Sequence, residues 1–161
     1  MAKKKDKKNR EPRIDNRKAR HQYHIEDKLE VGIALLGSEI KSIRLGEISL
    51  AEGFARVEPK TGELWLHGVH IAPYAQATGT NAPDANRSRK LLAHKREIRK
   101  LVGQTSAKGA TLVPLALYFV RGRAKLEIGV ATGKTHQDKR QDLKSKDADR
   151  DMRRAMTRKR L

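Results

Sequence analysis

The chain contains no cysteine, so neither a disulfide framework nor a cysteine-bearing zinc site can stabilise it. Its histidines include the pairs His21/His24 and His67/His70, whose partners would point to opposite faces of a strand. We therefore expect no metal site and no cofactor. No apolar run approaches the roughly 18 residues of a membrane span, and no signal-type apolar stretch follows the basic N-terminus. The sequence predicts a soluble, cytoplasmic protein without membrane contacts.

A pattern for catalysis is also missing. Residues 129–135 (GVATGKT) are one residue short of the phosphate-binding Gly-x4-Gly-Lys-[Ser/Thr] loop, and they lead into a charged tail. Ser38, Ser42 and Ser49 have no partner pattern for a nucleophile and its base. We expect no enzyme and no small-molecule substrate. An NTP-dependent enzyme, the alternative that this loop leaves, would show hydrolysis that depends on Lys134.

Aromatic residues are few: Tyr23, Phe54, Trp65, Tyr74, Tyr118 and Phe119. No Gly-Phe-rich strand of the kind that stacks bases in an RNA-recognition motif is present. We therefore expect folded RNA to be read through its shape, its phosphates and a few polar contacts, and not by splaying out single strands. Trp65 and Phe119 are expected to fill the core.

Positive charge, in contrast, is abundant and uneven. The net charge is +18, of which residues 1–20 carry +7, residues 21–131 carry +5 and residues 132–161 carry +6. Two basic arms that flank a compact core commonly bind phosphate. The alternative is that the arms are solvated tails that bind no partner and only raise solubility.

The middle of the chain is expected to fold into a mainly β domain, an oligonucleotide-binding-type antiparallel barrel of about six strands with two to three helices. Alternation over residues 29–35 predicts a strand, followed by a short helix that Ser38 caps and Gly46 ends. Two hairpins are predicted. One covers residues 54–71, with its turn at 59–62, and the other covers residues 111–130. Pro114 cannot donate to a ladder, so its strand should lie at an edge or carry a bulge.

Between the hairpins we expect a flexible polar loop over 75–88 and a helix from about Arg89 to Val102, which Gly103 would end. The arm of residues 1–20 is predicted to be disordered, so that structure would begin near His21. The tail of residues 132–161 is dense in charge, but it contains no Pro and no Gly after Gly133, and most of its residues tolerate or favour helix. It is expected to be loose when free and helical on a polyanion.

Four stretches in register resemble the SmpB family of SsrA-binding (tmRNA-binding) proteins over roughly Asn16 to Met156. They are Asn16 to Tyr23 (NRKARHQY), Glu30 to Arg44 (EVGIALLGSEIKSIR), Arg89 to Ile98 (RKLLAHKREI), and Gly133 to Asp142 (GKTHQDKRQD). The resemblance implies the barrel fold and an adaptor role in trans-translation. The family binds the tRNA-like domain of tmRNA and, with charged tmRNA and elongation factor Tu, enters the vacant A site of a stalled ribosome. Alanyl-tRNA synthetase is implied as a partner through the charged tmRNA.

The resemblance also implies where tmRNA is bound. Glu30 corresponds to the family's RNA-binding glutamate, although a local structural hydrogen bond is the competing role. Leu92 corresponds to an apolar contact beside the RNA, although a helix leucine is more often core. The other expected tmRNA contacts are amide, cationic or aromatic: Asn16, Lys18, Arg20, His21, Tyr23, Lys41, Arg44, Lys90, Lys95 and Arg96. A solvated charged face would have the same composition.

The family's tail is implied to fold as a helix in the empty mRNA channel of the small subunit, next to the decoding centre. The corresponding residues here are Lys134, His136, Gln137, Asp138, Lys139, Arg140, Met152 and Met156. One departs from the family pattern: Gln137 stands where the family usually has Tyr or His, with His136 one residue earlier. Either could fill the decoding-centre position. The main alternative function is a ribosomal or ribosome-assembly protein that binds rRNA.

Overall fold

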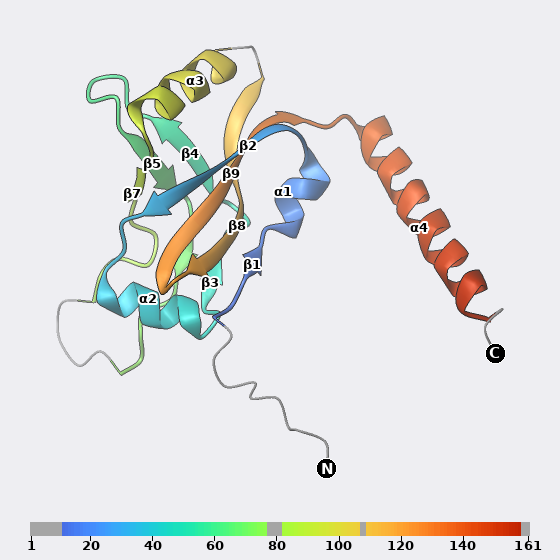
Figure 1. Cartoon of the computed structure of the whole chain (residues 1–161), viewed down its shortest axis with the longest axis horizontal. Helices are drawn as coiled ribbons and strands as arrows, with labels where there is room; N and C mark the ends of the chain where they lie inside the picture. Colours follow the sequence, from blue (N-terminus) through green and yellow to red (C-terminus); the bar gives the residue numbers. More distant parts are fainter. Residues whose placement is uncertain (1–10, 77–81, 107–108, 159–161) are drawn as a thin grey trace.

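The structure, a computed structural model, describes residues 11–76, 82–106 and 109–158. Its centre is an antiparallel sheet of seven strands in the order β1-β8-β4-β5-β7-β2-β9, and β9 pairs with β8 as well. Six strands thus form a ring, with β1 attached to the outside of β8 (Figure 1). The strands are β1 (Ile14–Asp15), β2 (Tyr23–Ile33), β4 (Phe54–Val57), β5 (Leu64–His67), β7 (Arg89–Leu92), β8 (Ala110–Val120) and β9 (Arg123–Gly133).

The remaining elements cover the ring or extend from it. A separate two-stranded sheet pairs β3 (Ile48–Ser49) with β6 (His70–Ile71). The helices are α1 (Arg17–Gln22), α2 (Gly37–Arg44), α3 (Lys95–Thr105) and α4 (His136–Arg158). The prediction of a mainly antiparallel β fold with helices is confirmed. The sheet is a ring rather than a fully bonded barrel, because β4 and β8 pair only at Ala55 and Leu112.

The core fills the ring as the alternation of the strands predicts. Val31 and Ile33 of β2 and Leu126, Ile128 and Val130 of β9 are buried. They pack with buried side chains of β5, β7 and β8, while α2 and α3 add Ile43 and Leu101. This burial removes apolar area from water and is the main stabilising term of the fold.

The hairpin of β8 and β9 confirms the prediction made for residues 111–130. Its strands join through Arg121 and Gly122, which both have positive φ, 51° and 75°. A two-residue turn of this kind matches the twist of the flanking strands. The register shifts between Pro114 and Ala116, so the proline lies at a bulge, one of the two positions predicted for it.

Two local predictions in the first part of the chain need correction. Residues before His21 are not all outside the fold, because Ile14 pairs with Leu117 in β1 and α1 begins at Arg17. Ser38 does not cap α2. The cap position is Leu36, whose N–H donates to the Glu39 carboxylate at 2.9 Å. The acid at the third helical position therefore satisfies the N–H of the cap residue, whereas a serine cap would have accepted from an amide inside the first turn.

The predicted helix over 89–102 is also wrong in its first part. Arg89–Leu92 is strand β7, which pairs with both β5 and β2. Helix α3 starts only at Lys95 and runs past Gly103 to Thr105. The hairpin over 54–71 is confirmed by the pairing of β4 with β5, and Gly68, with φ of +68°, separates β5 from β6. Part of the predicted flexible loop, residues 77–81, lies outside the described residues.

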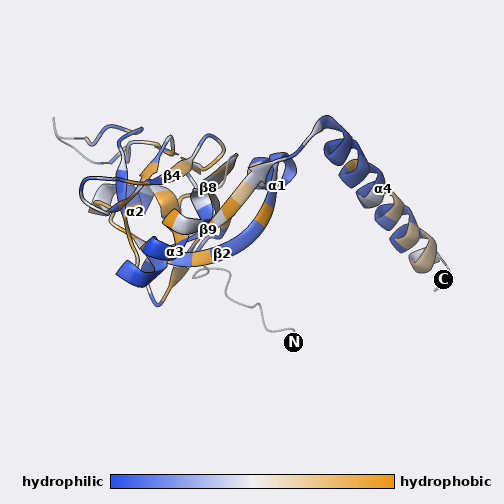
Figure 2. Ribbon diagram, turned by 90° about the horizontal axis from the view of Figure 1, so that it is seen from above, coloured by the Kyte–Doolittle hydropathy of each residue, from blue (hydrophilic) through white to orange (hydrophobic). Residues whose placement is uncertain are grey.

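Helix α4 extends away from the ring, and its sequence is mostly hydrophilic (Figures 1 and 2). It spans 23 residues without any bound polyanion, whereas the sequence predicted a tail that is loose when free. That the tail is helical on a polyanion stays a prediction. Leu143, Met152 and Met156 on it are exposed. Among the described helices, none is both long and apolar enough to cross a membrane.

Candidate nucleic-acid interface

The outer face of β8, β9, β2 and β7 brings together residues that are distant in sequence. The register pairs Tyr118 with Lys125, Lys125 with Gly32 and Gly32 with Leu92, which makes one row across four strands. Glu30 lies two residues before Gly32 on β2 and shares its face. We call Tyr118, Lys125, Gly32, Leu92 and Glu30 the outer row.

Glu30 is exposed and held from two sides. The Tyr118 hydroxyl donates a hydrogen bond to its Oε2, and the Lys125 ammonium lies 3.7 Å from its Oε1. The hydrogen bond to Glu30, together with burial and the negative charge of Glu127, raises the pKa of Tyr118 to about 12. Tyr118 therefore stays a neutral donor and aims the carboxylate, while the remaining lone pairs of Glu30 face solvent.

A groove runs beside the outer row because Gly32 has no side chain. A Cβ at Gly32 would lie 3.2 Å from the Cβ of Leu92. The groove has a volume of about 490 Å³ and is bordered by Leu92, Ile40 of α2 and Arg123 at the tip of the β8–β9 hairpin. Leu92 is 54% exposed on its strand. A large exposed apolar side chain at a groove indicates a contact surface rather than core packing.

Cations predicted to bind RNA surround this face to different degrees. On α2, Lys41 lies over the Tyr74 ring at 5.2 Å and Arg44 lies over the Phe119 ring at 5.4 Å. Lys95 and Arg96 are exposed in the first turn of α3. Arg44 also pairs with Glu11 at 3.3 Å, and three other cations are engaged by acids: Lys18 with Glu52, Lys90 with Glu63, and Arg20 with Asp15 at 3.7 Å.

The structure gives Asn16 a role other than the predicted RNA contact. It is 3% exposed, and its amide donates to Leu50 O at 2.9 Å and Pro114 O at 2.8 Å. Its Oδ1 accepts from Ala19 N and so caps α1. Asn16 fastens α1 to the ring, since a buried amide with all these bonds has nothing left for RNA. His21 and Tyr23 are half-buried at the end of the same helix.

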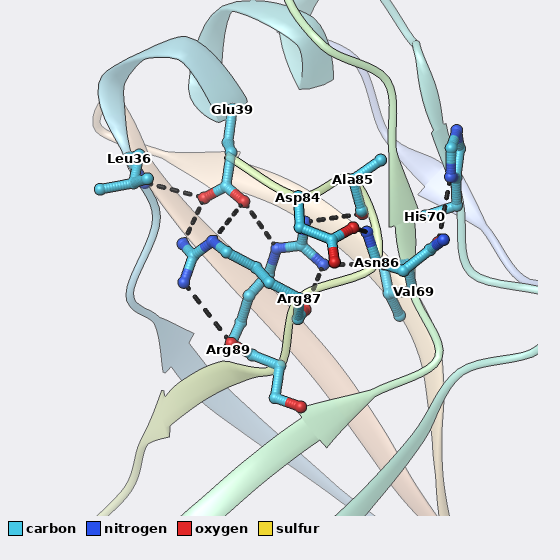
Figure 3. Close-up of polar contacts among 10 residues, drawn as sticks. Leu36, Glu39, Val69, His70, Asp84, Ala85, Asn86, Arg87 and Arg89 are labelled. Atoms are coloured by element: carbon cyan, nitrogen blue, oxygen red, sulfur yellow. Dashed lines mark hydrogen bonds and ion pairs between the residues drawn. The ribbon is translucent and has the colours of Figure 1, made fainter. Parts of the chain in front are cut away.

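A buried ion network beneath α2 was missed in the sequence. The Glu39 carboxylate accepts from Arg87 Nη2 at 2.6 Å and from Arg89 Nε at 2.9 Å (Figure 3). Arg89 also donates to Val69 O, Arg87 O and Ala85 O. Burial alone would raise the pKa of Glu39, but hydrogen bonds from Arg87, Leu36 N and Arg89 outweigh it and lower that pKa. The network joins α2, which carries Lys41 and Arg44, to the first residue of β7 and to the segment before that strand.

The base of α4 is built from a reciprocal cap. Thr135 Oγ1 accepts from Asp138 N at 3.3 Å, and Asp138 Oδ2 accepts from Thr135 N at 3.0 Å. The hydrogen bonds from the Thr135 hydroxyl and amide, with a smaller contribution from His24, lower the pKa of Asp138. His24 Nε2 lies 3.6 Å from Asp138, so this acid also faces β2. Asp138 was predicted to contact the ribosome, but in the free chain its carboxylate is already bonded to Thr135 and lies next to His24.

Lys134 differs most from its predicted role in the tail. Its side chain is 8% exposed and pairs with Asp142 of α4. Its ammonium also donates to Arg20 O at 3.2 Å, and its backbone N–H to Gln22 O at 2.8 Å. Lys134 therefore attaches α4 to α1 instead of facing a partner. The other predicted tail contacts stay accessible to different extents: His136, Gln137, Arg140, Met152 and Met156 are exposed, and Lys139 is half-buried.

Within the described ranges, no group of three or more His, Cys, Asp or Glu side chains could hold a metal ion. The outer row, the cations of α2 and α3 and the α4 helix offer hydrogen bonds, charge and apolar contact. These are the means of binding a polyanion by shape and phosphate.

Comparison with known proteins agrees with this reading. The family model described as "SmpB protein" matches residues 13–158. The chain belongs to the SmpB family. The SsrA-binding protein of Thermobifida fusca is 54% identical over 146 residues, which cover 90% of this chain and 89% of that protein. The SsrA-binding protein of Carboxydothermus hydrogenoformans is 53% identical over 142 residues, 88% of this chain and 93% of that one.

A solved SmpB-family structure shares the fold. Described as "tmRNA-SmpB: a journey to the center of the bacterial ribosome", it superposes with a TM-score of 0.65 at 46% identity. The match covers 82% of this chain and 94% of that one. The family resemblance predicted from four sequence stretches is therefore confirmed.

Proposed function

We propose that this SmpB-family chain is an RNA-binding adaptor of trans-translation. It binds the tRNA-like domain of tmRNA, enters the vacant A site of a stalled ribosome in the cytoplasm and leads to ribosome rescue and peptide tagging. Elongation factor Tu and alanyl-tRNA synthetase meet it only through the charged tmRNA. Its relatives are called SsrA-binding proteins, and the solved neighbour is named with tmRNA and the ribosome.

One observation carries the RNA-binding half of this proposal: the outer row sets an oriented carboxylate beside an exposed leucine. Glu30 is held by Tyr118, and Leu92 is 54% exposed across Gly32. A carboxylate accepts from base amino groups, and an apolar side chain packs on a ribose or base. Lys41, Arg44, Lys95 and Arg96 supply the surrounding phosphate contacts.

The tail accounts for the ribosome-binding part of the proposed function. In the proposal, α4 lies in the empty mRNA channel next to the decoding centre, where its exposed cations face rRNA phosphates. His136 and Gln137 begin this helix, and Met152 and Met156 are one turn apart near its far end. Removal of the residues after Thr132 should leave tmRNA binding largely intact and abolish tagging. Tagging by the truncated chain would rule out this two-part scheme.

The first experiment compares affinity for the isolated tRNA-like domain and for an elongator tRNA across a salt titration. A protein of this charge binds any RNA at low salt, so only the ratio near physiological ionic strength is informative. Glu30→Gln should weaken binding to the tRNA-like domain about tenfold, the scale of one lost base contact. Glu127→Gln, which changes the residue opposite Glu30 in the register, is the matched control.

Equal affinities for both RNAs, falling together as salt rises, would favour the alternative of a ribosomal or ribosome-assembly protein. Such a protein would also copurify stoichiometrically with ribosomes. If Glu30→Gln and Glu127→Gln both leave binding to the tRNA-like domain unchanged, the outer row is not the binding surface.

A further inference from the structure

The ring has an open seam on the side away from the outer row. β4 and β8 pair only at Ala55 and Leu112, and a groove of about 390 Å³ lies over this seam, with the end of α3 beside it. In the ring order β8-β4-β5-β7-β2-β9, two strands separate β4 from β2 in either direction. Side chains that point outward from β4 therefore face away from Glu30.

One wall of the groove is an exposed aromatic ring. Phe54 is 45% exposed and stacks on the imidazole of His67, with ring centroids 5.2 Å apart and an interplanar angle of 27°. His67 is itself held by a 2.7 Å hydrogen bond between its Nδ1 and Ser88 Oγ. The Phe54 ring is thus supported on one face and borders the groove.

The opposite walls are aliphatic and hydroxylic. Val102 of α3 is 44% exposed at the groove, next to Ser106 and Thr111. The Ser106 hydroxyl donates to Val102 O at 2.7 Å, which leaves its oxygen free to accept. Aromatic, aliphatic and hydroxyl walls together suit a flat heterocycle with polar edges.

Cationic side chains lie beside this groove. Arg56 borders the groove and is on the same face of β4 as Phe54. A second groove of about 340 Å³ shares Val57 and Val102 with the first and is bordered by Lys95 and Arg99. Across residues 11–76, 82–106 and 109–158, Arg56, Lys95 and Arg99 make no ion pair. Arg56 and Arg99, which are not among the cations assigned to the outer row, are available for phosphates on either side of a bound base.

We propose that this seam groove binds an unpaired nucleobase of single-stranded RNA. The base stacks on Phe54, and Arg56 together with Arg99 of α3 contacts the flanking phosphates. An acidic peptide would use the same cations but has no need of the Phe54–His67 stack, so the aromatic pair favours RNA. This site goes beyond the proposed function, because it takes a single strand on the face opposite the outer row. It also departs from the sequence-based expectation that the protein reads only folded RNA.

The test uses the full chain and hexaadenylate, a single-stranded probe, at about 150 mM salt, where charge alone binds weakly. Trp65, the single tryptophan, pairs with Arg56 across β4 and β5 and reports binding by fluorescence. Phe54→Leu should weaken binding about tenfold, the scale of one lost stacking contact. Phe54→Tyr should restore it. Tyr74→Leu, an aromatic change at a different site, should leave it unchanged.

Three outcomes would overturn the proposal: Phe54→Leu binds hexaadenylate as tightly as the unaltered chain, an abasic hexamer binds equally well, or hexaglutamate competes as well as RNA. Urea unfolding of Phe54→Leu separates a lost site from a lost fold, and Phe54→Tyr provides a second, folded readout. Glu30→Gln should retain full hexaadenylate affinity. Failure of the outer row is thereby distinguishable from failure of this groove.

Discussion

The carboxylate of Glu39 accepts a hydrogen bond from the Nε of Arg89 at 2.9 Å, and these side chains are only 3% and 1% exposed. The Nη1 and Nη2 groups of Arg89 donate hydrogen bonds to three backbone carbonyls. A buried pair of this kind adds little net stability over an apolar pair. Removing one partner is costly because the other charge is left buried.

Glu39→Ala should therefore lower the free energy of unfolding by about 3 kcal/mol or more. It strips the counter-charge from Arg89 and Arg87 and the hydrogen-bond acceptor from Leu36 N. Urea unfolding followed by Trp65 fluorescence measures the loss. Glu58→Ala, at an exposed position beside the β4–β5 turn, is the control and should stay within about 0.5 kcal/mol of the unaltered chain. Similar midpoints for both variants would contradict a structural role of the network.

Acid should destabilise the fold in part through Asp27. Hydrogen bonds from Lys100, Gln104 and Lys28 N lower the pKa of Asp27 from 3.8 to about 2. The folded chain therefore binds fewer protons here than the unfolded chain, and stability is lost as pH falls from about 4 toward 2. In Asp27→Asn, the drop in the urea midpoint between pH 5 and pH 3 should be smaller. An unchanged drop in Asp27→Asn, or an equal reduction in the exposed-site control Glu47→Gln, would argue against this assignment.

Thr135→Ala should loosen the start of α4. It removes the hydroxyl that accepts from Asp138 N and one donor to the Asp138 carboxylate, a cap worth about 1 kcal/mol. Hydrogen exchange of the amides in residues 136–139 should accelerate about fivefold. Thr157→Ala changes a threonine near the other end of α4 and should leave those amides unaffected. Unchanged exchange in Thr135→Ala would mean that the cap does not hold this turn.

Lys134→Met should release the helix from α1 while preserving its helicity, because Lys134 joins Asp142 and Arg20 O. The chain has no cysteine, so spin labels at Glu58→Cys and Ser145→Cys report one distance without interference. The distance distribution should broaden in Lys134→Met. It should stay narrow in Lys144→Met, the control at an exposed site on α4. Equal widths in the two variants would show that Lys134 does not set the direction of the helix.

Local patterns in the sequence predicted the elements whose partners are adjacent in the chain. The β8–β9 hairpin and the bulge at Pro114 follow from alternation and from the missing proline donor. Residues 89–92 were mistaken for helix because Leu91 fits the spacing of Ile98 and Leu101. The strand there is specified by pairing with β2 and β5, which are distant in sequence, and tertiary context overrides propensity.

The candidate site was predictable where function requires exposure and was not where a polar group is buried. Glu30 and Leu92 were expected at a surface, and both are exposed. Asn16, Arg89 and Lys134 are buried polar residues, and a sequence contains no sign that carbonyls from other elements will surround them. The His94-x-x-Glu97 spacing was a usable signal for the true start of α3, since Glu97 accepts from His94 N at 2.8 Å.

The joint between β9 and α4 also has a mechanical consequence. Strand β9 ends at Gly133 and α4 begins at His136, and the helix of 23 residues is about 35 Å long at 1.5 Å per residue. A rotation of about 10° at the joint would move the far end of such a helix by roughly 6 Å. The helix is a lever arm, and the two residues between strand and helix, one of them Lys134, are its fulcrum. The orientation of the joint on the ring therefore determines the position of Met152 and Met156, and the length of the helix determines their distance from the ring.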